Sequence, residues 1–141
     1  MINLVPARAE MASLIRPQPS QMKFGVDISP GALQRFIDSG LAFAVVDGSE
    51  VLALGGARDI WPGRAVAWGL LSSGIGATMV PITRAVRRFL DTCPTRRIEA
   101  EVAVDHEEGR RWVEMLGFER EGTMRAYWGN ADFHLYARVR N

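Results

Sequence analysis

The chain has 141 residues, of which 48% are hydrophobic and 23% are charged, so it carries enough apolar surface to bury a core and is not expected to be disordered. Its 17 Lys and Arg residues nearly balance 16 Asp and Glu residues, and the net charge of +1 argues against a general nucleic-acid binder, because such proteins usually carry a marked basic excess. This length favours one domain, which we expect to span residues 1–141.

The N-terminal part of the chain predicts one strand and two helices. An apolar run favours a strand at 2–5, and apolar side chains at helical spacing favour a helix within 7–15. The polar, proline-rich stretch 16–27 predicts a loop. A second helix is expected within 29–40.

The middle of the chain predicts three strands and then a helix. Apolar runs of strand length lie at 41–46, 51–57 and 64–71, with short turns between them. Gly69, inside the third of these strands, indicates a bulge or a close approach of another backbone. An apolar stripe opposite an arginine-rich face predicts a helix over 79–93.

The C-terminal part predicts a strand, a helix and two closing strands. The strands are expected at 97–104, 118–128 and 132–140, and the helix at 105–117. The full order is then β-α-α-β-β-β-α-β-α-β-β. It predicts an α/β (α+β) fold in which helices cover both faces of one mixed, mostly antiparallel sheet.

Two of these helices carry capping signals. Ser29 is expected to be the N-cap of the second helix, and Gly40 is expected to end it. Before the last helix, Asp105 is the expected N-cap and Glu108 completes a capping-box pattern.

The cysteine count and the apolar runs bear on where the protein works. Cys93 is the sole cysteine, so no disulfide can form within the chain. No apolar run reaches the roughly 18 residues of a membrane span, and residues 1–18 lack the basic and apolar regions of a signal peptide. One cysteine and two scattered histidines predict no metal site. We therefore expect a cytoplasmic protein without membrane contacts.

Residues 106–118, HEEGRRWVEMLGF, add a family resemblance to this order of elements. They resemble a helix of the Gcn5-related N-acetyltransferase (GNAT) family that starts with Asn, continues with a small residue and a Tyr, and ends in Leu-Gly-Phe. His106, Gly109 and Val113 stand at the first three of these positions here, and the Leu-Gly-Phe matches. The stretch 116–139 is similar to the usual ending of that family.

A second motif, LSSGIG at 71–76, lies between a predicted strand and a predicted helix. It resembles the pyrophosphate loop of the same family, although Leu71 replaces the usual Gln or Arg. Gly74 and Gly76 would let backbone N–H groups face an anion, and a plain strand-to-helix turn is the alternative. Pro81 follows closely, so the helix is expected to begin later than usual in the family.

The resemblance implies acetyl-CoA, or another acyl-CoA, as co-substrate. The strand before the loop would pair with the pantetheine arm, the loop would hold the pyrophosphate, and two residues of the later helix would contribute. The implied cofactor-binding residues are Gly69, Leu70, Leu71, Ser72, Ser73, Gly74, Ile75, Gly76, Ala77, Thr78, His106 and Arg110. For His106 and Arg110, a solvated helix face is the alternative.

The catalytic half of the resemblance is less complete. Acyl transfer to an amine needs a base for the ammonium proton and often an acid for the departing thiolate. The acid in the family is the Tyr that Val113 replaces, and a valine transfers no proton. The strand at 64–71 carries no carboxylate, so the candidates for the base are His106, Asp59 and His134, or a water relay without a fixed base.

Three hypotheses of function follow. The first is an acyl-CoA-dependent N-acyltransferase acting on a small-molecule or protein amine, with substrate loops at 16–28 and 128–132. The second is a catalytically degenerate protein of the same fold, because Val113 replaces the Tyr and the strand at 64–71 carries no carboxylate. Residues 72–91 and 97–102 also resemble a bacteriophage group that includes internal virion protein A of T7-type phages, so this protein would be virion-associated or a binding protein, with a homodimer among the options. The third, a nucleic-acid-binding domain, rests on TRAVRR at 83–88 and is disfavoured by the net charge of +1.

Overall fold

The computed structural model describes residues 1–23 and 27–141, so residues 24–26 of the loop predicted at 16–27 lie outside the described residues. Within the described residues, seven strands form one sheet in the order β1-β2-β3-β4-β5-β7-β6. The strands are β1 (Ile2–Pro6), β2 (Gly40–Asp47), β3 (Glu50–Trp61), β4 (Arg64–Leu71), β5 (Arg97–Ala103), β6 (Glu119–Trp128) and β7 (Ala131–Val139). The helices are α1 (Pro30–Asp38), α2 (Met79–Thr92) and α3 (Glu107–Met115), with short 3-10 helices η1 (Ala9–Ser13), η2 (Pro19–Met22) and η3 (Gly76–Thr78).

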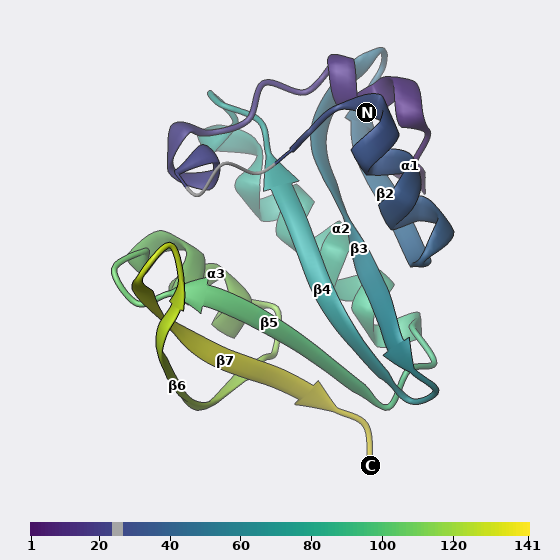
Figure 1. Cartoon of the computed structure of the whole chain (residues 1–141). Helices are drawn as coiled ribbons and strands as arrows, with labels where there is room; N and C mark the ends of the chain where they lie inside the picture. The colour runs from purple at the N-terminus through teal and green to yellow at the C-terminus, as the bar shows by residue number, and fades with distance from the viewer. Residues whose placement is uncertain (24–26) are drawn as a thin grey trace.

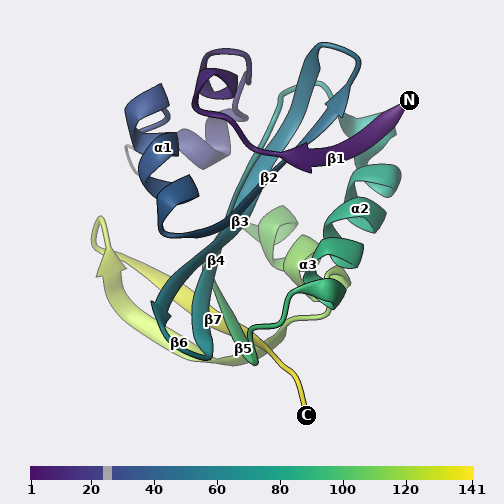
Figure 2. The same cartoon turned by 90° about the vertical axis from the view of Figure 1, so that its right-hand side faces the viewer.

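Helices cover the sheet on both faces. In Figure 2, α1 lies on one side of the sheet and α2 and α3 lie on the other. Phe43 and Val45 of β2 join the buried cluster beneath α2 and α3, whereas Ala44 between them joins the cluster beneath α1. This is the alternation that a strand buried on both faces requires. The predicted fold class is confirmed.

One pair of neighbouring strands separates along its length. β4 and β5 run parallel, whereas the other neighbouring pairs are antiparallel. In the part of the chain that the structure describes, β4 and β5 pair only at residues 64–66 and 97–99. Beyond these residues the two strands diverge, as Figure 1 shows. Their C-terminal halves therefore face each other without a shared hydrogen-bond ladder.

The helix predicted within 7–15 is wrong in type. The segment forms a 3-10 helix over Ala9–Ser13. Pro6 belongs to β1 and Pro17 belongs to a β-bridge, and a segment confined between them is too short to gain much from α-helix propagation. Met11 is nevertheless buried beneath α1, as the spacing of the apolar residues indicates.

The capping predictions are confirmed at α1 and wrong at α3. The Ser29 side chain accepts a hydrogen bond from a backbone N–H in the first turn of α1. At α3 the N-cap is His106, which makes no side-chain capping bond within the described structure. Asp105 forms an ion pair with Lys23 instead, so Glu108 has no capping partner there and completes no capping box among the described residues.

Two backbone expectations are also corrected. Gly40 opens β2 rather than ending α1, which stops before it. The β3–β4 ladder runs regularly past Gly69, so the described strand has no bulge at that position. Helix α2 begins at Met79, as predicted, and Pro81 fits within its first turn because a proline there does not need an N–H partner.

Gly40 and Gly56 allow β2 and β3 to approach closely. A Cβ at Gly56 would lie 2.0 Å from the Leu41 carbonyl oxygen, and one at Gly40 would lie 2.0 Å from the Ala57 carbonyl oxygen. These neighbours are backbone atoms, so they cannot move aside unless the strands separate. We expect Gly56→Ala to lower the free energy of unfolding by about 3 kcal/mol, measured by urea denaturation.

Gly122 on β6 provides the matched control for this substitution. A Cβ there would meet open space in the described part of the chain. We expect Gly122→Ala to change the free energy of unfolding by less than about 0.5 kcal/mol. Equal effects of the two substitutions would contradict the steric role assigned to Gly56.

Candidate functional site

The diverging halves of β4 and β5 border a cavity of about 570 Å³, a volume typical of small-molecule sites. Residues 68–71 of β4 and 100–103 of β5 form two of its walls, and His106, Gly109 and Trp112 add a third from α3 and its N-cap. We call this cavity the cleft. We call the part of the cleft next to the paired residues 64–66 and 97–99 its closed end, and the part at the C-terminal tips of β4 and β5 its open end.

The cleft-facing edge of β4 presents backbone groups that bind an amide. The Leu71 N–H donates to the Gln21 Oε1 at 2.7 Å, and the Gln21 Nε2 donates to the Gly69 carbonyl oxygen at 3.3 Å. The Leu71 carbonyl oxygen accepts the Gln18 N–H at 3.1 Å. A single carboxamide thus satisfies one donor and one acceptor of this edge.

This carboxamide belongs to a segment that lies along the open end of the cleft. The backbone of residues 16–18 pairs with residues 71–73 in the manner of a short extra strand. Farther along the segment, the Lys23 Nζ lies 3.0 Å from the Asp105 Oδ2, which follows β5. We call residues 16–23 the strap, because the segment joins the tip of β4 to the turn after β5.

The loop predicted to hold phosphates continues from the tip of β4 into α2. Ile75 anchors the loop in the buried cluster beneath α2. Gly74 has a φ of +76°, in the left-handed region that favours glycine. A Cβ at Gly76 would meet open space within the described residues, so packing does not demand glycine at that position. The backbone at Gly76 is therefore uncovered on that side.

The hydroxyl groups of this loop already have partners inside the protein. Each donates to a backbone carbonyl oxygen, at 2.9 Å for Ser72, 3.3 Å for Ser73 and 2.7 Å for Thr78. The hydroxyls therefore fix the shape of the loop. Its backbone N–H groups remain the better candidates for contact with an anion.

His106 and Arg110, the two predicted cofactor contacts near the start of α3, lie in different surroundings. His106 lines the cleft, and a Cβ at Gly109 would lie 2.5 Å from its Nδ1, so the histidine ring explains the small residue at that position. Burial first, and then the charges of Arg120 and Arg110, lower the pKa of His134 on β7. The charge of Arg110 thus affects His134 on β7. Arg110 is not among the described residues that line the cleft.

His134, another candidate from the sequence, is buried in a hydrogen-bonded cluster of β6 and β7. Its Nε2 lies 3.3 Å from the Arg120 Nη1, and its Nδ1 lies 2.8 Å from the Thr123 Oγ1. Because a guanidinium only donates, Nε2 is the acceptor and the Nδ1–H donates to the hydroxyl. These contacts account for the burial of the ring, and His134 is absent from the cleft lining formed by the described residues.

Glu101 is a carboxylate of the cleft that the sequence reasoning missed. It lines the cavity from β5, whereas its neighbours Ala100 and Val102 join the buried cluster on the opposite face. Partial burial raises the pKa of the Tyr127 phenol, and a hydrogen bond to the Glu101 carboxylate raises it further. The alternation of 97–104 contains this signal, since its polar face carries the carboxylates.

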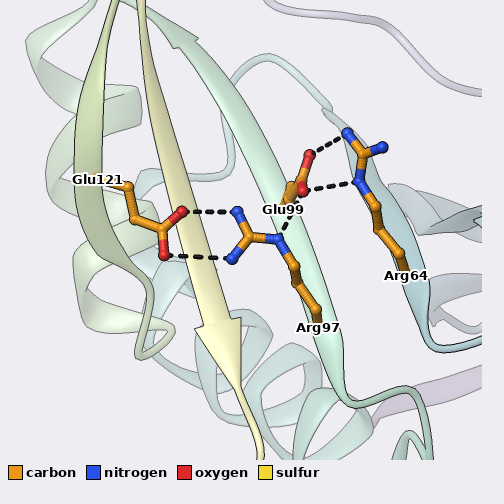
Figure 3. Close-up of polar contacts among 4 residues, drawn as sticks. All are labelled: Arg64, Arg97, Glu99 and Glu121. Carbon is orange, nitrogen blue, oxygen red and sulfur yellow. Dashed lines mark hydrogen bonds and ion pairs between the residues drawn. The ribbon is translucent and has the colours of Figure 1, made fainter.

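A network of ion pairs fixes the closed end of the cleft (Figure 3). The Glu99 side chain is 5% exposed and accepts two hydrogen bonds from Arg64, at 2.8 and 2.9 Å, and one from the Arg97 Nε at 2.6 Å. Arg97 also donates to Glu121 of β6 at 2.6 Å. The hydrogen bonds from Arg64, and then the one from Arg97, lower the pKa of Glu99 against the opposing effect of burial.

Two positions considered for proton transfer remain, Asp59 and Val113, and they lie in different environments. Asp59 is exposed near the end of β3 and lies outside the cleft lining that the described residues form. Val113 is buried and lines the cleft, where it offers no proton for transfer. Of the predicted site residues, the structure brings together at the cleft Gly69, Leu70, Leu71 and His106, with residues 72–78 in the adjoining loop.

Within residues 1–23 and 27–141, no group of three or more His, Cys, Asp and Glu side chains is arranged to hold a metal ion. No helix in the same part of the chain combines the length and the apolarity needed to cross a bilayer.

Solved structures with this architecture include several N-acetyltransferases. The ribosomal-protein-S5-alanine acetyltransferase from Vibrio fischeri matches with a TM-score of 0.80 at 17% identity, over 99% of this chain and 93% of that chain. A spermidine N-acetyltransferase chimera, of SpeG from Vibrio cholerae and hSSAT, matches at 0.76 with 16% identity, over 98% and 95%. An N-acetyltransferase from Staphylococcus aureus Mu50 matches at 0.77 with 10% identity, over 99% and 97%.

The likeness to known proteins is structural. The chain matches no protein-family model and no curated protein. The identities of 10%, 16% and 17% establish the fold alone, because one fold can host many functions. The chain has the GNAT fold that its order of elements predicts.

Proposed function

We propose that the chain is an N-acyltransferase that moves an acyl group from acyl-CoA, most simply acetyl-CoA, to an amine. The observation that carries the proposal is the cleft, where β4 and β5 separate around about 570 Å³ and the β4 edge already binds an amide group. The pantetheine arm of CoA is an extended chain that contains amide groups. It therefore has the chemistry that an unpaired strand edge recognises.

The residues around the cleft fit the parts of this co-substrate. Gly69 and Leu71 would bind the amides of the arm through backbone groups. Residues 74–77, which precede the N-terminus of α2, would bind the pyrophosphate, because unpaired N–H groups and the helix dipole favour an anion there. His106 would lie beside the bound arm. When bound, acyl-CoA supplies the acyl group as an activated thioester.

Glu101 is the residue to which we assign removal of the amine proton. An ammonium group must lose a proton before its nitrogen can attack a carbonyl carbon, and a carboxylate in the cleft can accept that proton. The Tyr127 phenol, whose pKa is raised by burial and by the Glu101 carboxylate, would orient the carboxylate. The negative charge of Glu101 also favours a cationic amine as acceptor. An acceptor of this kind agrees with the spermidine and the protein alanine in the names of two Vibrio enzymes of the same fold.

Calorimetric titration with acetyl-CoA tests the proposal, and Gly76→Trp is the blocking variant. We expect the wild type to bind acetyl-CoA. We expect Gly76→Trp to weaken binding by at least about tenfold, because an indole would fill the open approach to the loop. Gly122→Trp places the same side chain on β6 and is expected to leave the affinity unchanged. Failure of the wild type to bind at near-millimolar acetyl-CoA would refute the proposal.

Transfer itself is measured as release of free CoA with a thiol reagent. The acceptors to compare are polyamines, other primary amines and peptides with a free N-terminus. A common rate for all of them, equal to the rate without an amine, would indicate hydrolysis or no catalysis. A rate that depends on the acceptor would identify its class.

A second candidate is a non-catalytic protein of the same fold, used as a binding module or as a virion component of a bacteriophage. Two observations favour it. Val113 stands where a family enzyme carries its proton donor, and the strap already fills the β4 edge. This candidate predicts no CoA release with any amine, together with stable self-association or retention on another protein. Turnover that Gly76→Trp abolishes would exclude it.

A further inference from the structure

The amide-binding edge of β4 is filled by the chain itself. The Gln21 carboxamide donates to the Gly69 carbonyl oxygen at 3.3 Å and accepts the Leu71 N–H at 2.7 Å. These are the backbone groups that the proposed function assigns to the amides of the co-substrate. A carboxamide and an incoming amide use the same donor and the same acceptor, so both cannot occupy these groups at once.

The strap that carries Gln21 is fastened unequally on its two sides. On one side its backbone pairs with the chain after β4: the Ser73 N–H donates to the Arg16 carbonyl oxygen at 2.7 Å. On the other side it is fastened by the ion pair between Lys23 and Asp105, whose side chains are 58% and 69% exposed. Exposed ion pairs add little stability. The Lys23 side of the strap can therefore detach while the backbone pairing at residues 16–18 stays in place.

We propose that Gln21 is a displaceable plug of the cleft, which occupies the β4 edge in the free protein and leaves it when an acyl-CoA binds. This inference rests on the proposed function, because the displacing ligand is the one assigned there. Displacement breaks two hydrogen bonds, and the arriving amide replaces them. The plug thus reduces the apparent affinity to the intrinsic affinity multiplied by the fraction of molecules in which the β4 edge is open. It also satisfies the strand edge when no ligand is present.

Amide hydrogen exchange detects the plug without any ligand. In the wild type we expect the Leu71 N–H to be protected, because it donates to Gln21. In Gln21→Ala its exchange should be at least about tenfold faster. Gln34→Ala is the matched control, since Gln34 is an exposed residue of α1 that bonds to Asp38. Unchanged exchange at Leu71 in Gln21→Ala would overturn the plug.

Calorimetry with CoA then separates the plug from the proposed function. We expect Gln21→Ala to bind CoA about tenfold more tightly than the wild type, because two hydrogen bonds no longer compete with the ligand. Gln34→Ala should match the wild type. Equal or weaker binding by Gln21→Ala would overturn the plug and leave the proposed function standing. Absence of binding by all three proteins would overturn both.

Lys23→Ala tests the plug without altering the β4 edge. Removing the ion pair to Asp105 loosens the strap, so Leu71 exchange and CoA affinity should both rise by about twofold to threefold. The two measurements report the same opening and must change together. A gain in affinity without faster exchange at Leu71 would overturn the plug, and so would no change in either quantity.

Discussion

Glu101→Gln is expected to lower kcat for acyl transfer by about 10²- to 10⁴-fold and to leave the affinity for acetyl-CoA unchanged. The amide keeps the size of the carboxylate but cannot accept the amine proton. Glu101 lines the cleft from β5, so the substitution acts at the site of transfer rather than in the buried clusters. Steady-state CoA release gives kcat, and calorimetry gives the affinity.

Glu108→Gln is the control for this experiment. Glu108 is exposed in the first turn of α3 and lies outside the cleft lining of the described chain. We expect this variant to retain the kcat of the wild type. A parallel loss of kcat and of acetyl-CoA affinity in Glu101→Gln would point to a damaged cleft and would contradict the assigned role in proton removal.

Glu99→Ala is expected to lower stability about as much as Gly56→Ala. It removes the shared partner of Arg64 and Arg97, whose side chains are only 29% and 30% exposed. Removing one member of a largely buried ion pair costs about 3 to 5 kcal/mol. Since the two arginines keep some access to water, we expect the free energy of unfolding in urea to fall by about 3 kcal/mol.

An exposed ion pair provides the comparison. Glu107→Ala breaks the pair between Glu107 and Arg111 on α3, whose side chains are 62% and 71% exposed. Its effect on the free energy of unfolding should stay below about 0.5 kcal/mol. Similar losses in Glu99→Ala and Glu107→Ala would contradict the importance assigned to the network at the closed end of the cleft.

The same network predicts how stability depends on pH. The arginines hold the pKa of Glu99 below its ordinary value of 4.5 in the folded protein. The stability that this shift contributes is therefore fully present above pH 4.5 and is lost as the pH falls through the lower, folded pKa. The difference in unfolding free energy between the wild type and Glu99→Gln should shrink over that acidic range. A difference that stays constant there would contradict the assignment.

Much of the sheet could be predicted because its signal is local. The runs 41–46, 51–57 and 64–71 are apolar and of strand length, and the third matches β4 residue for residue. The helix expected within 7–15 could not be typed in this way, because its geometry depends on the bridge that Pro17 makes with a residue distant in sequence. The N-cap prediction for α3 was wrong for a similar reason, since Asp105 forms an ion pair with Lys23, which is distant in sequence.

The residues of the candidate site also differ in whether local sequence could predict them. The loop glycines and His106 belong to short motifs, so the sequence could indicate them. The role proposed for Gln21 depends on its contacts with Gly69 and Leu71, and the role proposed for Glu101 depends on the divergence of β4 and β5. Such contacts join segments far apart in the chain, and no spacing along the sequence encodes them.

The two ends of the cleft differ in how mobile ions reach them. The Lys23–Asp105 pair at the open end is solvated, whereas the Glu99 carboxylate at the closed end is 5% exposed. Dissolved salt weakens exposed ion pairs and affects buried charges much less. Rising ionic strength therefore weakens the ion pair at the open end of the cleft and leaves the network at the closed end in place. Salt acts on entry to the site before it acts on the fold.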